Sequence, residues 1–406
     1  MNERLQRNIK LLYIFSFLRF FAFWQPIEQL FLFSIGASTA VLGIGTALWT
    51  LSQFAFEIPS GYISDKFGKK NVFYIAQASR IAGFLVIAIP RKVSTYYLGL
   101  ILFGAAMAFI SGSDKALLHD SLVDLKREKE YKRISGIMNG LSGIGVMAAG
   151  ILAVFIARFG YSYNYSLSII PQLLVLLVIF MMFEPKHYTK ELLKNPARDM
   201  MTAIKSITTV KALQLLVLLA GTMELVKRIN MDFGQAFLFS VIGAVTLVPA
   251  IWVIGTGSRA LSNFIAHKVE SHTWGLVAAT FLIFIVMSFS SRIIAPILYI
   301  LVFLPVNIVI LQAEEAVQKV APAHLRATRL SGMNMLINIV QTLPIIALGW
   351  FMADRNPILG FQISSITICI AVAFVYLITL TGRKKIKTEV LLLNQDETFT
   401  YLKWAF

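Results

Sequence analysis

Long apolar stretches recur along almost the whole chain, and short polar segments separate them. A helix needs about 20 consecutive apolar residues to cross the hydrocarbon core of a bilayer, where every backbone polar group must be paired internally. Charged residues make up only 14% of the 406 residues, against roughly 25% in an average soluble domain. These features exclude a soluble fold and predict an all-α polytopic membrane protein.

Hydropathy and helix-breaking residues predict twelve transmembrane helices with both chain ends in the cytoplasm. In this orientation most of the 37 Lys and Arg residues lie in cytoplasmic segments, as the positive-inside rule requires. The opposite orientation would reverse that asymmetry. The expected spans are 11–35, 39–60, 72–90, 95–118, 135–157, 162–183, 209–242, 245–266, 273–291, 293–318, 330–352 and 357–381.

The longest internal polar stretch, 184–208, divides the predicted helices into six and six. Similar segments recur on corresponding helices of the two halves: QLFLFSIGA with QAFLFSVIGA, RISG with RLSG, and DKAL with EEAV. Their spacing favours duplication of a six-helix unit, as in transporters with internal repeats. The expected parts are an N-terminal bundle (1–183), a cytoplasmic linker (184–208), a C-terminal bundle (209–382) and a basic cytoplasmic tail (383–406).

The segment between the second and third predicted helices, 61–70, reads GYISDKFGKK. It resembles the cytoplasmic-loop signature of the major facilitator superfamily, Gly-x-x-x-Asp-(Arg/Lys)-x-Gly-(Arg/Lys)-(Arg/Lys). The resemblance covers essentially the whole chain, because the number of spans and the six-plus-six division also agree. It implies the fold of that superfamily, two pseudo-symmetric six-helix bundles, but it does not identify a substrate.

The same resemblance implies a cytoplasmic gate, in which Asp65 meets the N-terminal end of a neighbouring helix and holds the bundles together. The alternative is a basic loop that only sets the topology. The gate motif consists of Gly61, Asp65, Lys66, Gly68, Lys69 and Lys70. The segment 111–122 resembles bacterial drug-exporter-like members, whereas Val146 stands where the antiporter pattern of the superfamily has proline.

Ionisable residues inside the predicted spans are functional candidates, because a charge at membrane depth is costly. Most of them lie on the first, fourth, seventh and tenth spans, which line the central cavity in the fold that the chain resembles. We therefore expect these charges to face water and substrate rather than lipid. They are Arg19, Glu28, Asp114, Lys115, Lys211, Glu224, Lys227, Arg228, Asp232, Glu314 and Glu315.

The seventh span has the densest group of charges. Glu224, Arg228 and Asp232 are four residues apart and share one helical face, with Lys227 beside them. The group is either an ion-pair ladder that stabilises helix packing or a site that exchanges its internal pairs for substrate or a proton. Desolvation favours the protonated form of an unpaired carboxyl group. The candidate proton carriers are therefore Glu224, Asp232 and Glu28.

Neutral polar residues form stripes on the fifth and eleventh spans, at positions i, i+4 and i+7. Such residues either form hydrogen bonds between helices or line a cavity. Near the cytoplasmic end of the fourth span, Asp114 and Lys115 are either gate residues or a structural pair. The stripes consist of Ser135, Asn139 and Ser142 and of Asn334, Asn338 and Gln341.

The residue pattern argues against several functional classes. Cys369 is the single cysteine, so neither a disulfide nor a cysteine-based metal site forms within the chain. The five histidines fall at or near loops without metal or catalytic spacing, and the sequence has no Walker phosphate loop. The net charge of +16 is spread over many segments, which argues against a nucleic-acid partner. We expect no enzyme activity, metal or cofactor.

The function that the sequence supports best is secondary transport by alternating access, with proton-coupled efflux of an amphipathic drug-like compound or metabolite. The alternatives are an organic-anion carrier that uses the basic residues of helices 1, 4 and 7, and a lipid flippase or scramblase. We expect a monomer in the bacterial plasma (inner) membrane, with a small-molecule substrate, protons and lipid as partners. The predicted translocation residues are Arg19, Glu28, Asp114, Lys115, Glu224, Lys227, Arg228, Asp232, Asn139, Asn334, Asn338 and Gln341.

Overall fold

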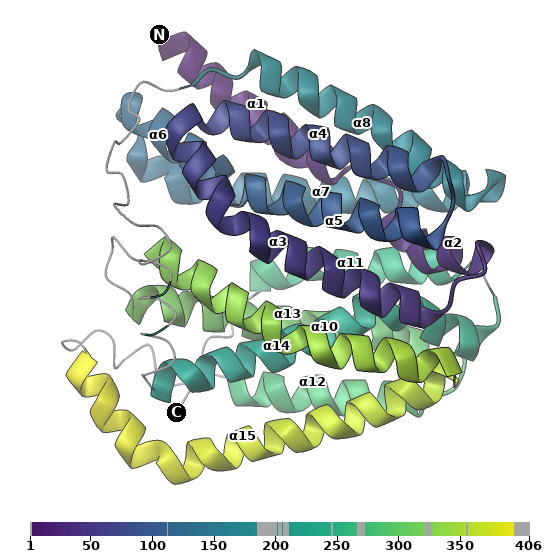
Figure 1. Cartoon of the computed structure of the whole chain (residues 1–406). Helices are drawn as coiled ribbons and strands as arrows, with labels where there is room; N and C mark the ends of the chain where they lie inside the picture. The colour runs from purple at the N-terminus through teal and green to yellow at the C-terminus, as the bar shows by residue number, and fades with distance from the viewer. Residues whose placement is uncertain are drawn as a thin grey trace. The chain divides into compact units, whose positions relative to one another are not determined.

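The computed structural model describes residues 2–111, 113–184, 201, 205, 211–244, 247–265, 273–320, 326–354 and 356–393. Within these ranges the regular elements are helices, and no strand occurs among them. The chain forms two compact units, Met1–Pro196 and Ala197–Phe406, whose helices are labelled in Figure 1. The helical content agrees with the predicted all-α fold class.

The N-terminal unit is built around α5, which packs against α3 and α4, while α1 packs against α7 and α4 against α8. A core of buried apolar side chains from α1, α4, α5, α6, α7 and α8 joins these helices. The elements of this unit are α1 (Asn2–Phe20), η1 (Gln25–Ile27), α2 (Glu28–Ser34), α3 (Thr39–Phe67), α4 (Lys69–Ala88), α5 (Val93–Ile110), α6 (Ser113–Asp124), η2 (Glu128–Glu130), α7 (Tyr131–Ile156), η3 (Ala157–Phe159) and α8 (Tyr161–Met181).

The C-terminal unit repeats this arrangement. Its helix α13 packs against α11 and α12, while α10 packs against α14 and α12 against α15. These pairings match, helix for helix, those of α5 with α3 and α4, of α1 with α7 and of α4 with α8, as a duplicated unit requires. The elements are α10 (Lys211–Ile242), α11 (Val248–Ile265), α12 (Thr273–Ser288), α13 (Ile294–Val320), α14 (Arg326–Asp354) and α15 (Pro357–Leu393).

Each unit has a close contact between a glycine and a tyrosine of its central helix. A Cβ atom at Gly45 in α3 would lie 2.9 Å from Cε1 of Tyr96 in α5. One at Gly255 in α11 would lie 3.0 Å from Cε1 of Tyr299 in α13. Both tyrosines are fully buried. Small residues at such crossings allow helix backbones to approach closely, as is typical of helix packing in membranes.

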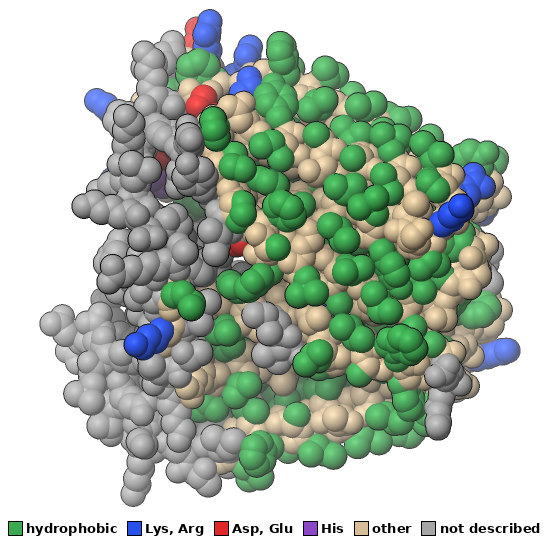
Figure 2. Space-filling model, viewed as in Figure 1, with side chains coloured by type: hydrophobic (Ala, Val, Ile, Leu, Met, Phe, Trp, Pro, Cys, Tyr) green, Lys and Arg blue, Asp and Glu red, His purple; other side chains and the backbone are tan. Residues whose placement is uncertain are grey.

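The surfaces of both units are rich in large apolar side chains. Leu177 in α8 and Phe374 in α15 are both more than half exposed, and Figure 2 shows hydrophobic side chains spread over the visible helices. By length and composition, eight helical segments of the described part could cross a membrane, and Val248–Ser258 and Thr273–Ser288 are shorter apolar helices. The full count of twelve crossings stays a prediction.

The first predicted span, 11–35, is interrupted. After α1 ends at Phe20 the chain passes through η1, and α2 begins at Glu28. Pro26 lies in the first turn of η1, where its missing N–H is harmless, whereas its ring would clash inside a continuous helix. The fourth span, 95–118, is also broken, because the backbone of Ser111 (φ −51°, ψ 118°) leaves the helical region between α5 and α6.

α3 is longer than the predicted span 39–60. Gly61, Asp65 and Lys66 therefore belong to the last turns of a helix rather than to a loop, and the side chains of Asp65 and Lys66 lie outside the described part of the chain. The turn itself is confined to Gly68, and α4 starts directly after it. The backbone φ angle of Gly68, +90°, lies in the region that favours glycine.

Candidate functional site

The two lysines at the start of α4 bind acceptors within the N-terminal unit. The Lys69 ammonium forms an ion pair with Asp120 of α6, and the two side chains are only 13% and 11% exposed. The Lys70 ammonium donates to the carbonyl oxygens of Phe180 and Met182, both at 2.8 Å. Carbonyls at the end of a helix are unpaired and carry partial negative charge. The predicted gate residues thus fasten α4 to α6 and α8.

Glu184 binds the same helix start. Its carboxylate accepts the backbone N–H groups of Lys69 at 3.0 Å and Lys70 at 2.9 Å. These N–H groups have no partner within the helix, and an acid at this end is favoured by the helix dipole. A Cβ atom at Gly68 would lie 3.2 Å from the Glu184 carboxyl carbon, so glycine leaves room for this contact. Glu184 was predicted only as the first residue of the linker.

Arg19 and Asp114 lie on different helices and form an ion pair. Arg19 Nη1 donates to Asp114 Oδ2 at 3.3 Å, and the side chains are 10% and 20% exposed. The Arg19 guanidinium also lies over the Phe20 ring, 4.7 Å from its centroid, in a cation–π arrangement. Lys115 is exposed. Of these predicted residues, the structure joins Arg19 and Asp114 and leaves Lys115 at the surface of the unit.

Glu28 is placed by the interruption of the first span. It is the first residue of α2, where the positive end of the helix dipole stabilises a carboxylate. Its Oε1 accepts a hydrogen bond from the Tyr96 hydroxyl at 2.8 Å. The Glu28 charge also acts on the buried hydroxyl of Tyr165 in α8. A predicted proton carrier thus lies among tyrosine hydroxyls.

α10 holds two acid–base pairs within one helix. Glu224 pairs with Lys227, and Arg228 Nε donates to Asp232 Oδ2 at 2.9 Å. The four side chains are between 13% and 32% exposed. Asp232 also acts electrostatically on Tyr299 of α13. The helical spacing in the sequence correctly predicts that these residues can pair, and their part in transport stays a prediction.

The two polar stripes differ in their surroundings. In α7, Ser142 donates to a backbone carbonyl of α1 at 3.2 Å, which is the interhelical alternative, whereas Asn139 is exposed. In α14, Gln341 is only 6% exposed and Asn338 is partly buried. The side chain of Asn334 lies outside the described part. Cavity lining by these stripes stays a prediction.

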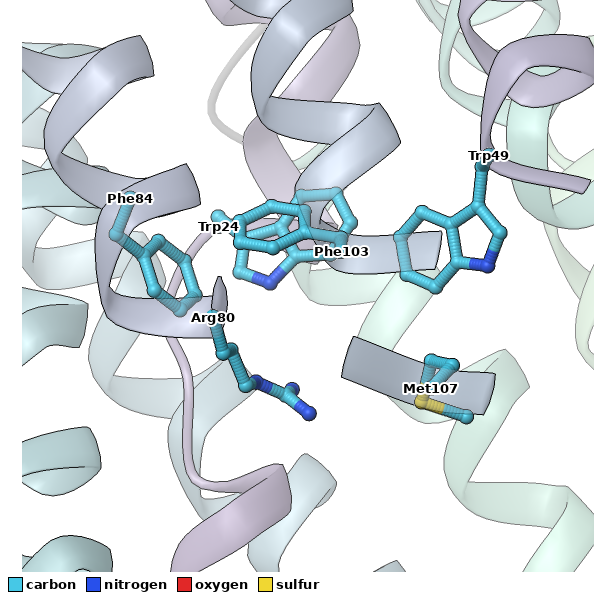
Figure 3. A pocket seen from close by; sticks show the side chains of 6 residues that line it. All are labelled: Trp24, Trp49, Arg80, Phe84, Phe103 and Met107. Carbon is cyan, nitrogen blue, oxygen red and sulfur yellow. The ribbon is translucent and has the colours of Figure 1, made fainter. Parts of the chain in front are cut away.

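A pocket in the N-terminal unit was not predicted. Its cavity volume is about 10 Å³, enough for about one water molecule. Arg80 of α4 is 9% exposed, and its Nε has no hydrogen-bond partner in the described structure. Figure 3 shows the Arg80 guanidinium reaching into the space between aromatic rings and a methionine. The lining residues are Trp24, Trp49, Arg80, Phe84, Phe103 and Met107.

The chemistry available in these places is that of ion pairs and hydrogen bonds. Among the described residues, no group of three or more His, Cys, Asp or Glu side chains is arranged to hold a metal ion. The charged groups instead form ion pairs and hydrogen bonds inside apolar helices. Such groups can exchange a partner for a proton or for a charged solute.

A comparison with known families decides the identity of the fold. Residues 10–382 match the sequence profile of the Major Facilitator Superfamily. The chain belongs to this superfamily. It is therefore a multi-pass membrane transporter and not an enzyme, and the predicted fold class is confirmed.

Other members of the superfamily are similar to this one over part or all of the chain. The class B tetracycline resistance protein of Escherichia coli is 22% identical over 249 residues, 60% of each chain. The class H protein of Pasteurella multocida is 22% identical over 166 residues, 41% of this chain and 40% of that protein. The chain thus matches less than two thirds of the length of either relative.

A solved structure of a superfamily transporter has the same fold. It is a bacterial homologue of the human lysosomal transporter Spinster in an inward-facing, unoccupied conformation. The TM-score is 0.74 at 13% identity, over 98% of this chain and 99% of that chain. At this identity the likeness shows the fold alone.

Proposed function

We propose that this superfamily transporter exports amphipathic drug-like compounds or metabolites in exchange for protons. The observation that carries the proposal is the set of two acid–base pairs on α10, Glu224 with Lys227 and Arg228 with Asp232. Charges at this depth are costly and mark ion pathways by default. The likeness to two tetracycline resistance proteins supports export, because a transporter confers resistance most directly by carrying the compound out of the cell.

Proton exchange follows when a substrate competes with Glu224 or Asp232 for its basic partner on α10. When a substrate draws the Lys227 side chain away, Glu224 is left as an unpaired charge in a poorly hydrated place. The carboxylate then takes up a proton, because desolvation disfavours its charged form. When Lys227 returns, the proton is released. Asp232 beside Arg228 and Glu28 beside Tyr96 are the other candidate carriers.

The proposal includes the organisation expected from the sequence. The transporter works as a monomer in the plasma membrane of a bacterial cell, with twelve crossings and both ends cytoplasmic. The bundles are 1–183 and 209–382, joined by the linker 184–208 and followed by the tail 383–406. The gate motif, at the end of α3 and the start of α4, holds the cytoplasmic side closed in one phase of the transport cycle.

Everted membrane vesicles with an acid interior test the exchange. A pH-sensitive dye reports proton release while lipophilic cations, neutral amphiphiles and then organic anions are added. The decisive variant is Glu224→Gln. The matched control is Glu130→Gln, which removes the acid of another pair three residues apart, Arg127–Glu130, at an exposed place (39% and 36% exposed). We expect amphiphiles to release protons in the wild type and the control but not in Glu224→Gln.

The opposite pattern favours the organic-anion carrier. In that case amphiphiles release no protons, while labelled organic anions cross the membrane and Arg228→Ala abolishes their flux. Equal amounts of each variant in the membrane, measured by quantitative blotting, exclude an expression effect. Proton release that persists in Glu224→Gln would remove Glu224 from the proton pathway.

A further inference from the structure

We propose that an anionic phospholipid, such as phosphatidylglycerol, binds where α1 begins and α8 ends. Its phosphate lies among three basic side chains, those of Arg4, Arg7 and Lys70, and its acyl chains lie along the exposed apolar face of α8. All of these residues belong to the N-terminal unit. The inference goes beyond the proposed function, because the lipid is not a transported compound and its binding is measurable without transport.

Basic side chains from α1 and α4 meet at the end of α8. Arg7 Nη2 donates to the Met181 carbonyl oxygen at 3.1 Å. The Lys70 ammonium donates to the carbonyl oxygens of the residues directly before and after Met181, both at 2.8 Å. The Arg4 guanidinium lies 5.8 Å from the centroid of the Phe183 ring. Three positive charges therefore gather around one helix end.

This basic cluster keeps charge and donors that an anion can use. A lysine ammonium has three donors and an arginine guanidinium has five, so the described contacts leave donors on all three residues. Arg4 and Arg7 are exposed, and Lys70 is partly exposed. Two acids lie on the neighbouring backbone: exposed Glu3 precedes Arg4, and the Glu184 carboxylate accepts two N–H groups of α4. Three bases and two acids leave a net positive charge.

An exposed apolar face of α8 begins at the basic cluster. Leu173, Leu177 and Phe180 follow the i, i+4, i+7 spacing of one helical face, and they are 48%, 61% and 73% exposed. The Lys70 ammonium lies 5.6 Å from the centroid of the Phe180 ring, so charge and apolar face meet at this ring. Figure 2 shows Lys and Arg side chains gathered near the start of α1, at the edge of a surface rich in hydrophobic side chains.

The combination of bases and apolar face matches a phospholipid with a net negative charge. Arginine and lysine form short charge-assisted hydrogen bonds with phosphate, and basic clusters beside membrane-spanning helices attract anionic lipids. A soluble phosphate ester would use the bases but leave the face below Phe180 uncovered. A zwitterionic lipid has the same chains, but its choline ammonium is repelled by the same three bases. The bound headgroup joins α1, α4 and α8.

Photo-crosslinking of the purified full-length protein in a neutral detergent tests the site. The probe is phosphatidylglycerol with a photoreactive diazirine in one acyl chain, and peptide mass spectrometry locates its adducts. The competitors are unlabelled phosphatidylglycerol, phosphatidylcholine with the same acyl chains, and chain-free glycerophosphoglycerol. We expect adducts on the α8 face of Leu173, Leu177 and Phe180. Phosphatidylglycerol should displace the probe at a concentration at least about tenfold lower than either other competitor requires.

Variants of the bases test the contact with the headgroup. Arg4→Gln, Arg7→Gln and Lys70→Gln should each weaken phosphatidylglycerol binding by about fivefold, the contribution of one basic residue near an anionic membrane surface. Arg7→Lys should keep most of the affinity, because it keeps the charge. The matched control is Lys129→Gln, since Lys129 is an exposed lysine of η2, which packs on α6 and α7 of the same unit. It should bind as the wild type does.

Four results would overturn the proposal. They are the absence of adducts on α8, equal competition by phosphatidylcholine, competition by glycerophosphoglycerol as strong as by the intact lipid, and unchanged affinity in a folded Arg7→Gln variant. The third would show an anion site that needs no acyl chain. If Lys70→Gln does not fold, Arg7→Gln decides, because Arg7 is exposed.

Discussion

The two units pack their helices alike but place their charges differently. In each, a buried tyrosine of the central helix lies against a glycine of a neighbouring helix. Tyr96 donates to the carboxylate of Glu28 at 2.8 Å, whereas Tyr299 donates to the backbone carbonyl of Asn230 at 2.9 Å. In the N-terminal unit an ion pair joins α1 to α6, whereas the described ion pairs of the C-terminal unit lie within α10.

The two kinds of ion pair differ in which structural elements must stay in place for the pair to persist. A pair within one helix moves with that helix as a rigid body and persists wherever the helix goes. A pair between two elements, such as Arg19 with Asp114, lasts only while both elements keep their places. The two units therefore share their apolar helix packing, whereas their ion pairs depend on different elements.

The largest expected effect is the loss of the pair between elements. Asp114→Ala leaves Arg19 buried without its acid, which should lower the free energy of unfolding by about 3 kcal/mol, at the lower end of the range for broken buried pairs. Asp232→Asn, within α10, should cost less, because the Arg228 side chain that it leaves is 32% exposed and keeps part of its hydration. The measurement is the midpoint of thermal unfolding of each purified variant. Equal shifts would show that the location of the pair is unimportant.

The shared glycine contacts should give an intermediate effect. Gly45→Ala places a Cβ atom 2.6 Å from Cδ1 of Leu100, whereas the nearest atom to a Cβ at Gly255 is 3.0 Å away. We expect a loss of about 2 kcal/mol for Gly45→Ala and a smaller loss for Gly255→Ala, because overpacking grows with the clash. Gly136→Ala is the control, since a Cβ atom there meets nothing within 4 Å. The reverse order of Gly45 and Gly255 in a thermal assay would contradict this reading of the repeat.

The tyrosine hydroxyls should give the smallest change in stability. Tyr96→Phe and Tyr299→Phe each remove one hydrogen bond, worth about 1 kcal/mol. Their effects on transport should differ, because Tyr96 contacts the candidate carrier Glu28 and Tyr299 binds a backbone carbonyl. We expect Tyr96→Phe, but not Tyr299→Phe, to alter the pH dependence of proton release in vesicles. Identical profiles for both variants would remove Glu28 from the proton pathway.

The features predicted correctly depend on neighbours along the chain. Apolar runs of the required length predict helices, because a backbone in lipid has few other ways to pair its polar groups. The ion pairs of α10 follow from a helical repeat that brings residues three and four apart together. The span 11–35 was predicted as one continuous helix, although Pro26 lies in it beside the polar residues Gln25, Glu28 and Gln29.

The sequence by itself determined the fold class and the pairing within α10, since each rests on local periodicity or composition. Only the tertiary structure decided which residue caps α4 and which buried arginine lacks an acid. Glu184 lies far from Lys69 in the sequence, and Arg80 is distinguished from Arg19 only by the absence of a described partner. These contacts depend on how helices that are distant in the sequence pack together, and no local sequence pattern encodes this packing.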